Sequence, residues 1–198
     1  MLLAWGLVVG VLVQIVIGGV VVLTGLNPYA NMAHFLVSLL LVANAFVLFR
    51  RSGQEPDTYF RTGPQRLVTA VRLVVGSSSI ALVTGTVVTA AGPHAGDENA
   101  VRLGFALTSV ARVHSVSVLI TVALIIFLAI RAKQLQGDAS VTDAIQALLF
   151  AAVFQGAIGY AQYFTGVPVA LVAAHIVGAT ALWFAVCNLA VSPSRGTL

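Results

Sequence analysis

The sequence contains very few charged residues. Of its 198 residues, 10 are Lys or Arg and 6 are Asp or Glu, whereas 59% are hydrophobic and the mean hydropathy is +1.02. A water-soluble domain of this length needs far more polar surface. The composition therefore excludes an ordinary soluble domain and predicts an integral membrane protein surrounded by lipid.

The sequence also lacks paired cysteines and a basic stripe. Its one cysteine, Cys187, cannot form an internal disulfide, and its place in an apolar run indicates a packing role. The net charge is +4, but the basic residues are not grouped along one segment. This argues against a nucleic-acid partner.

Long hydrophobic runs dominate the rest of the chain. A run of about 20 apolar residues matches the thickness of a bilayer, and runs without two-residue alternation favour helices over barrel strands. We expect one all-α membrane domain, residues 1–198, with six transmembrane helices at about 2–25, 30–49, 67–91, 109–130, 144–166 and 167–191. The first run is too long, and lacks the basic leader, for a removable signal peptide.

Basic residues in short loops predict the orientation, because such loops face the cytoplasm. The relevant residues are Arg50, Arg51, Arg61 and Arg66 between the second and third runs, Arg131 and Lys133 between the fourth and fifth, and Arg195 in the tail. Both termini are therefore expected in the cytoplasm.

Three histidines lie inside the apolar runs, and each lies near the same end of its run. With the orientation above, His34, His114 and His175 fall in the outer leaflet at depths of roughly 5 to 10 Å. An ionisable group in hydrocarbon is costly and is seldom kept without a partner or ligand. Imidazole is a common iron ligand, so the shared level predicts heme binding.

Small residues one turn from these histidines predict room for a flat macrocycle. They are Ala111 and Ser117 near His114, Gly178 and Ala179 near His175, and Ser38 near His34, whereas the bulky Leu171 must pack against a ring edge or point elsewhere. Near the same end, Arg112 could pair with a heme propionate or extend to lipid headgroups. His94, near Asp97 and Glu98, lies in a flexible loop that disfavours a metal site.

The chain repeats itself. Residues of the first two runs reappear at a constant offset in the last two: Gln14, Ile17, Gly18, Thr24, Gly25, Ala33 and His34 correspond to Gln155, Ile158, Gly159, Thr165, Gly166, Ala174 and His175. Because the copies are four spans apart, they run in the same direction, and the axis relating them lies along the membrane normal. The middle hairpin is expected to be a looser third copy, with Thr84-Gly85 taking the place of the Thr-Gly pairs.

Taken together, these motifs resemble the heme A synthase family over nearly the whole chain, from about Trp5 to Val191. The resemblance depends on the hairpin pattern from Gln14 to His34, Val83-Thr84-Gly85-Thr86, the loop Gly92-Pro93-His94-Ala95-Gly96-Asp97, Arg112-Val113-His114, and Gln155-Gly156 through Thr165-Gly166 to His175. Members are membrane oxidoreductases of eight helices in two four-helix halves. They oxidise the C8 methyl of heme O to the formyl group of heme A, which serves cytochrome oxidase.

The resemblance implies a role for each histidine. Residues 67–191 would form the C-terminal half, with heme b between His114 and His175, and residues 1–50 would belong to the N-terminal, substrate-heme half, where His34 binds the iron of heme O. The implied partners are heme O and heme A, an unidentified electron donor, and heme O synthase or assembly factors of cytochrome oxidase. The implied location is the plasma membrane of a prokaryote.

The family pattern has a further hairpin before the first run, carrying the facing histidine and a glutamate implicated in catalysis. No catalytic residue can therefore be assigned in this chain. A truncated chain, a misassigned start or a hairpin supplied by a partner would each explain the difference, and truncation is favoured.

Two other functions agree with some of the same features. A b-type cytochrome would only pass electrons, and its hemes would keep their substituents. A small proton-coupled transporter would use the histidines as a proton path, but no carboxylate accompanies them within the membrane.

Overall fold

The computed structural model describes residues 1–53, 65–94, 97, 99–135 and 139–192. These residues form six helices: α1 (Leu2–Leu23), α2 (Pro28–Ser52), α3 (Gln65–Ala91), α4 (Leu107–Gln134), α5 (Ala139–Phe164) and α6 (Val169–Val191). Each helix is long and apolar enough to cross a membrane. The prediction of an all-α, six-helix, multi-pass membrane protein is confirmed, and the expected boundaries differ from the observed ones by five residues or fewer.

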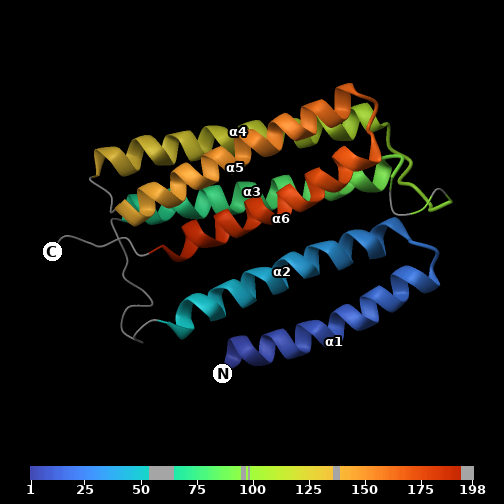
Figure 1. Ribbon diagram of the computed structural model, residues 1–198, viewed down its shortest axis with the longest axis horizontal. Coiled ribbons are helices and arrows are strands. Elements are labelled where there is room, and N and C mark those ends of the chain that lie inside the picture. The colour runs from blue at the N-terminus through green and yellow to red at the C-terminus, as the bar shows by residue number, and fades with distance from the viewer. Residues whose placement is uncertain (54–64, 95–96, 98, 136–138, 193–198) are drawn as a thin grey trace.

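Four of the helices form a closed unit. Helices α3, α4, α5 and α6 pack in a ring in which α3 contacts α4, α4 contacts α5, α5 contacts α6, and α6 contacts α3 (Figure 1). Helices α4 and α6 therefore lie diagonally across the unit. A residue on the inner face of one of them points toward the inner face of the other.

The hairpin α1–α2 lies beside this unit. Helix α2 packs against α6 and α3, whereas the substantial contacts of α1 are with α2, so that α1 forms the edge of the molecule in Figure 1. One buried hydrogen bond joins the two parts: the indole Nε1 of Trp183 donates to the carbonyl oxygen of Leu39 at 2.9 Å. The Phe46 and Phe184 rings also meet edge to face.

The two turns that connect the helices of the repeated hairpins have the same backbone conformation. Gly25 and Leu26 have φ angles of 62° and 62°, and Gly166 and Val167 have φ angles of 82° and 59°. In each turn, the amide after the glycine donates to a carbonyl five residues earlier, Leu26 to Val21 and Val167 to Gln162, each at 2.8 Å. This is the six-to-one bond that satisfies orphan carbonyls at a helix end. The repeat seen in the sequence is therefore also a repeat of backbone structure.

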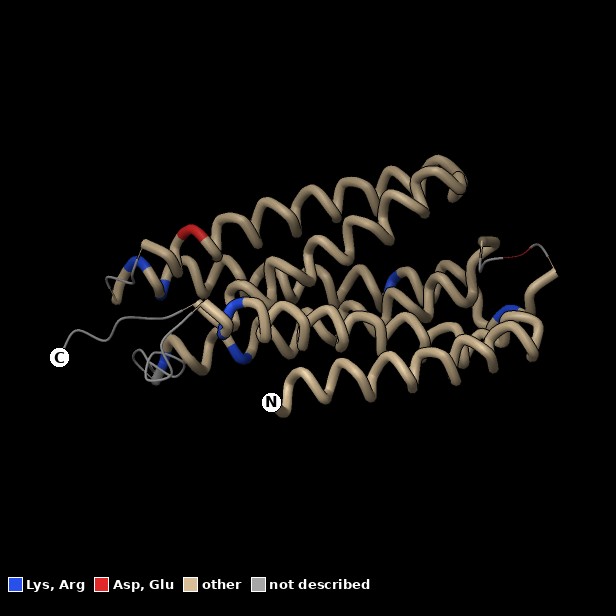
Figure 2. Tube along the Cα trace, turned by 60° about the horizontal axis from the view of Figure 1, so that its bottom comes forward, with Lys and Arg blue, Asp and Glu red and all other residues tan. Residues whose placement is uncertain are grey.

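The four-helix unit has a tightly packed apolar core in one half only. Its fully buried large side chains, Val74, Ile125, Leu128, Ile145, Leu148, Val186 and Leu189, all lie where α3 and α5 begin and α4 and α6 end. The same end holds Arg50, Arg51, Arg66, Arg131 and Lys133, and Figure 2 shows basic residues gathered there. Arg61 and Arg195 lie outside the described residues. The opposite half of the unit is hollow.

Candidate functional site

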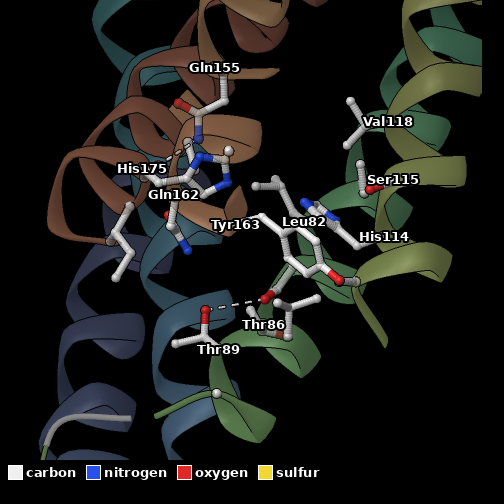
Figure 3. A pocket seen from close by; sticks show the side chains of 18 of the residues that line it. Leu82, Thr86, Thr89, His114, Ser115, Val118, Gln155, Gln162, Tyr163 and His175 are labelled. Carbon is white, nitrogen blue, oxygen red and sulfur yellow. Dashed lines mark hydrogen bonds between the residues drawn. The ribbon is translucent and has the colours of Figure 1, made fainter. Parts of the chain in front are cut away.

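Two histidines face each other across the hollow half of the four-helix unit. His114 extends from α4 and His175 from α6, and both lie six or seven residues after their helix begins (Figure 3). Their ring centroids are 6.5 Å apart and the ring planes are nearly perpendicular, at 88°. The diagonal arrangement of α4 and α6 thus brings together the two side chains expected to share one iron.

The distance between the rings suits one metal ion between two imidazoles. Metal–nitrogen bonds in proteins are about 2.0 Å long, and the distance from a ring nitrogen to the ring centre adds about 1 Å on each side. Two coaxial imidazoles on one metal therefore have centroids about 6 to 6.5 Å apart. The observed 6.5 Å agrees with this value.

The histidines line a cavity of about 740 Å³. This volume lies within the range of ligand pockets, about 300–1,000 Å³. Its wall is mostly apolar, with Leu82, Val118 and Leu182 among the lining residues, and polar groups such as Thr89, Gln162 and Tyr163 stand toward the outer end. A flat apolar ligand with polar substituents at one edge matches this distribution.

A glycine on the preceding helix contacts each of the two rings. A Cβ atom at Gly85 would lie 3.1 Å from Cε1 of His114, and a Cβ at Gly159 would lie 2.9 Å from Cε1 of His175. Any larger residue would displace the imidazole. These glycines therefore fix where the rings lie, beyond the close helix packing that small residues generally allow in membranes.

Hydrogen bonds constrain the backbone at both histidines and the ring of His114. Nε2 of Gln155 donates to the carbonyl oxygen of His175 at 2.6 Å, which ties α5 to α6. The hydroxyl of Thr84 is 3.1 Å from Nδ1 of His114, and Ser117 donates to the carbonyl oxygen of His114 at 2.7 Å. Gln155 is 91% buried, so its interaction is shielded from solvent.

His34 has the same local environment but a different location. It lies six residues into α2; a Cβ at Gly18 would be 3.3 Å from its Cε1, and Gln14 donates to its carbonyl oxygen at 3.0 Å. Gln14 also contacts the hydroxyl of Ser38. His34 does not line the cavity shared by His114 and His175, and no second histidine is recorded facing it among the described residues.

The remaining predicted residues lie at the mouth of the cavity or far from it. Arg112 is exposed and lines the outer mouth, as does His94. The described part of the loop is held by Arg102, which donates to the carbonyl oxygens of Pro93 and Asp97 at 2.7 and 2.8 Å. Cys187 is buried near the inner end of α6. The residues Ala95, Gly96 and Glu98 of the predicted motif lie outside the described residues.

No group of three or more potential metal ligands of the His, Cys, Asp and Glu types occurs within the described part of the chain. A porphyrin brings its own four nitrogen ligands and needs only two from the protein. The His114–His175 pair therefore remains a candidate for heme and not for a metal ion bound by side chains alone.

Two details of the sequence analysis were wrong. Gly178 does not leave space for a macrocycle, because a Cβ there would overlap Oε1 of Gln155, which occupies the gap. Thr84-Gly85 does not correspond to the turn pairs Thr24-Gly25 and Thr165-Gly166, because it lies within α3, six residues before the helix ends. The contact with His114 instead places Gly85 in register with Gly18 and Gly159.

Sequence reasoning also missed the pairing of glycines with histidines and the contact between Thr84 and the His114 ring. One signal was available: Gly18 precedes His34 by the same number of residues as Gly159 precedes His175. The longer loop between α3 and α4 hid the third pair. The side chain of Gln162 gave no signal, because only the fold brings it to the cavity.

Comparisons with known proteins identify no relative. The chain matches no protein-family model, no curated protein and no solved structure.

Proposed function

We propose that this membrane protein binds heme through His114 and His175. The observation that carries the proposal is the 6.5 Å separation of the two rings across an apolar cavity of about 740 Å³. Both rings enter from diagonally opposed helices whose backbones are fixed by a solid inner half. The cavity would cover the apolar faces of the porphyrin, and its polar outer end would receive the propionates.

The arrangement favours electron transfer at this site. When bound, heme would supply a one-electron couple. His114 and His175 would hold its iron, Gly85 and Gly159 set the positions of the two rings, and the exposed Arg112 at the mouth would pair with a propionate.

We further propose that the protein is a heme A synthase-like oxidoreductase that converts the C8 methyl of heme O to the formyl group of heme A. Support comes from the sequence resemblance and from the repeated environment of His34, which has the glycine and glutamine of His175. His34 would bind the iron of the substrate heme. His114 and His175 would hold a second heme, which would supply one-electron chemistry beside the substrate site.

The orientation is supported by the asymmetry of charge. Described basic residues gather at the end where α2 and α4 terminate, which supports an orientation with that end and both termini in the cytoplasm. The plasma membrane of a prokaryote is the location that the sequence resemblance supports. The heme site would then lie near the outer surface, and enzymes of heme O synthesis or oxidase assembly would be its partners.

Heme binding is tested by the absorption spectrum of the purified full-length chain. We expect a Soret band typical of low-spin heme b, which is lost in His114→Ala and His175→Ala. His34→Ala is the matched control, since it removes a histidine from an equivalent position outside the cavity and should keep this band. A wild-type chain without a Soret band after expression with added hemin would overturn the proposal.

A b-type cytochrome is the second candidate function, and the bis-histidine geometry favours it equally. The two are separated by extracting hemes from cells that make heme O and express the chain. Chromatography should reveal heme A if the chain is the enzyme, and unaltered hemes alone if it is only an electron carrier. The His34→Ala variant should lose heme A formation while keeping the Soret band of the other site.

A further inference from the structure

Thr84 provides a polar contact to the His114 ring. It lies on α3 directly before Gly85, the glycine against which the ring packs. Its hydroxyl oxygen is 3.1 Å from Nδ1 of His114, so the contact bridges α3 and α4. The side chain is half-buried, where competition from water is reduced.

The Thr84 hydroxyl has one proton and two neighbours on its own helix that can only accept it. The carbonyl oxygens of Ile80 and Ala81 are each 3.0 Å away, and carbonyls do not donate. A third neighbour, Oγ of Ser117, is 2.9 Å away, and either hydroxyl can be the donor in that contact. When Ser117 gives its proton to the carbonyl oxygen of His114, 2.7 Å away, it accepts from Thr84.

These neighbours favour Nδ1 of His114 as the donor to Thr84. If Nδ1 carried a lone pair, it would compete with the Ile80 and Ala81 carbonyls for the one proton of the Thr84 hydroxyl. With a proton on Nδ1, the imidazole donates to Thr84, and Thr84 donates to a carbonyl or to Ser117. The Ala81 carbonyl gives the ring an additional acceptor.

We propose that Thr84 is a positioning residue that holds neutral His114 in the tautomer with its proton on Nδ1 and its lone pair on Nε2. The inference rests on the proposed heme site, where it identifies Nε2 as the nitrogen of this ring that binds iron. Fixing the tautomer of a ligating histidine through its other nitrogen is the general task of groups around a metal site.

Thr84 has no counterpart in the other two hairpins. The residues before Gly18 and Gly159 are Ile17 and Ile158, which have no polar side-chain atom. Nδ1 of His34 and Nδ1 of His175 are buried without a hydrogen-bond partner. The two axial ligands are therefore unequal: a hydroxyl fixes His114, whereas packing and the backbone bond from Gln155 hold His175.

This inequality predicts measurable properties of the heme. Donation from Nδ1 to a hydroxyl makes Nε2 a stronger base and favours ferric iron, and loss of such a partner commonly weakens metal binding about 10- to 100-fold. We expect Thr84→Val to speed heme loss by a factor in that range and to raise the midpoint potential. Thr84→Ser, which keeps a hydroxyl, should return both toward wild type.

The first experiment uses the purified full-length chain loaded with heme b. Transfer of heme to excess apomyoglobin measures retention, and a redox titration measures the midpoint potential. Thr180→Val is the matched control, since the Thr180 hydroxyl bonds to the Ile176 carbonyl of its own helix and does not line the cavity. Equal retention and equal potential in wild type and Thr84→Val would overturn the inference.

The second experiment reads the tautomer without heme. Nitrogen-15 NMR of the histidine-labelled full-length chain in lipid nanodiscs, assigned with His114→Asn, should give a protonated Nδ1 and an unprotonated Nε2 for His114. Thr84→Val should shift the ring toward the opposite tautomer. A wild-type proton on Nε2 would overturn the inference. A proton on Nδ1 in a chain that never binds heme would support the tautomer and overturn the proposed function, so the two failures are distinguishable.

Discussion

Each of the three histidines within the helices packs against a glycine on the helix before it. The distances that a Cβ would have to the histidine Cε1 are 3.3 Å at Gly18, 3.1 Å at Gly85 and 2.9 Å at Gly159. The absence of a side chain lets the ring lie close to the neighbouring helix, because an added methyl group would overlap the ring at Gly159 and press against it at Gly18 and Gly85. The glycine is thus part of the site although it has no functional group.

Gly159→Ala should therefore displace the His175 ring and weaken heme retention. We expect a loss of about 10-fold or more, comparable to the loss of a supporting group around a metal. The absorption spectrum and the rate of heme transfer to apomyoglobin measure the effect. Gly76→Ala is the control, since nothing lies within 4 Å of a Cβ built there, and it should behave as wild type. Unchanged retention in Gly159→Ala would mean that the ring position is not set by this contact.

The element that repeats in this protein is a hairpin in which a glutamine on the first helix donates a hydrogen bond to the histidine carbonyl on the second. We call this interaction the glutamine clasp. Gln14 donates from α1 to the His34 carbonyl, and Gln155 donates from α5 to the His175 carbonyl. Both clasps lie between helices joined by the same turn, with a glycine and the next residue at positive φ. In the hairpin α3–α4, Ala81 takes the glutamine position, and Thr84 and Ser117 supply the polar contacts instead.

The clasp gives a prediction at the scale of one hairpin. Gln155→Leu should lower the stability of the four-helix unit by about 0.5 to 2 kcal/mol, because interhelical hydrogen bonds in membranes have values in that range. Heme should be lost at a lower temperature, as measured by following the Soret band on heating. Gln14→Leu removes the equivalent bond from α1–α2 and should leave the temperature of heme loss nearly unchanged. Equal shifts in both variants would contradict the separation of the two parts.

On the scale of the whole molecule, the chain is a closed four-helix unit with an attached hairpin. The unit has large apolar side chains buried at one end and a cavity at the other, so the rigid part and the binding part are separate. The α1–α2 hairpin joins it mainly along α2, through contacts that include the Trp183–Leu39 hydrogen bond and the Phe46–Phe184 pair. Both histidines of the proposed heme site belong to the four-helix unit, whereas α2 adds Pro28, Asn31, Met32 and Phe35 to the cavity wall.

Removal of the attached hairpin should therefore leave His114 and His175 facing each other but open the part of the cavity wall that α2 supplies. A chain lacking residues 1–60 should keep a low-spin Soret band in detergent, at reduced thermal stability because α3 and α6 lose their contacts with α2. The matched deletion of residues 139–198 leaves two hairpins but removes His175, and it should lose the band. A helical fragment from the first deletion that binds no heme would show that α2 is required for the site.

The sequence by itself determined the helices and the parallel orientation of the repeated hairpins. Apolar runs long enough to span a bilayer must be helical, since backbone groups in lipid have no water to bond, and the constant offset of the repeat required parallel copies. The same physics brought the three histidines to one level, because each follows the start of its helix by six or seven residues. These properties depend on distances along the chain, which the sequence contains.

Only the tertiary structure decided which histidines meet. The sequence offers three equivalent imidazoles, but the ring of contacts among α3, α4, α5 and α6 places His114 opposite His175 and leaves His34 on a hairpin at the side. It also decided that Gly178 makes room for Gln155 and that Gly85 and Thr84 touch His114. These relations depend on how each helix is rotated and which neighbour it packs against, and uniformly apolar helices give little sequence signal for either.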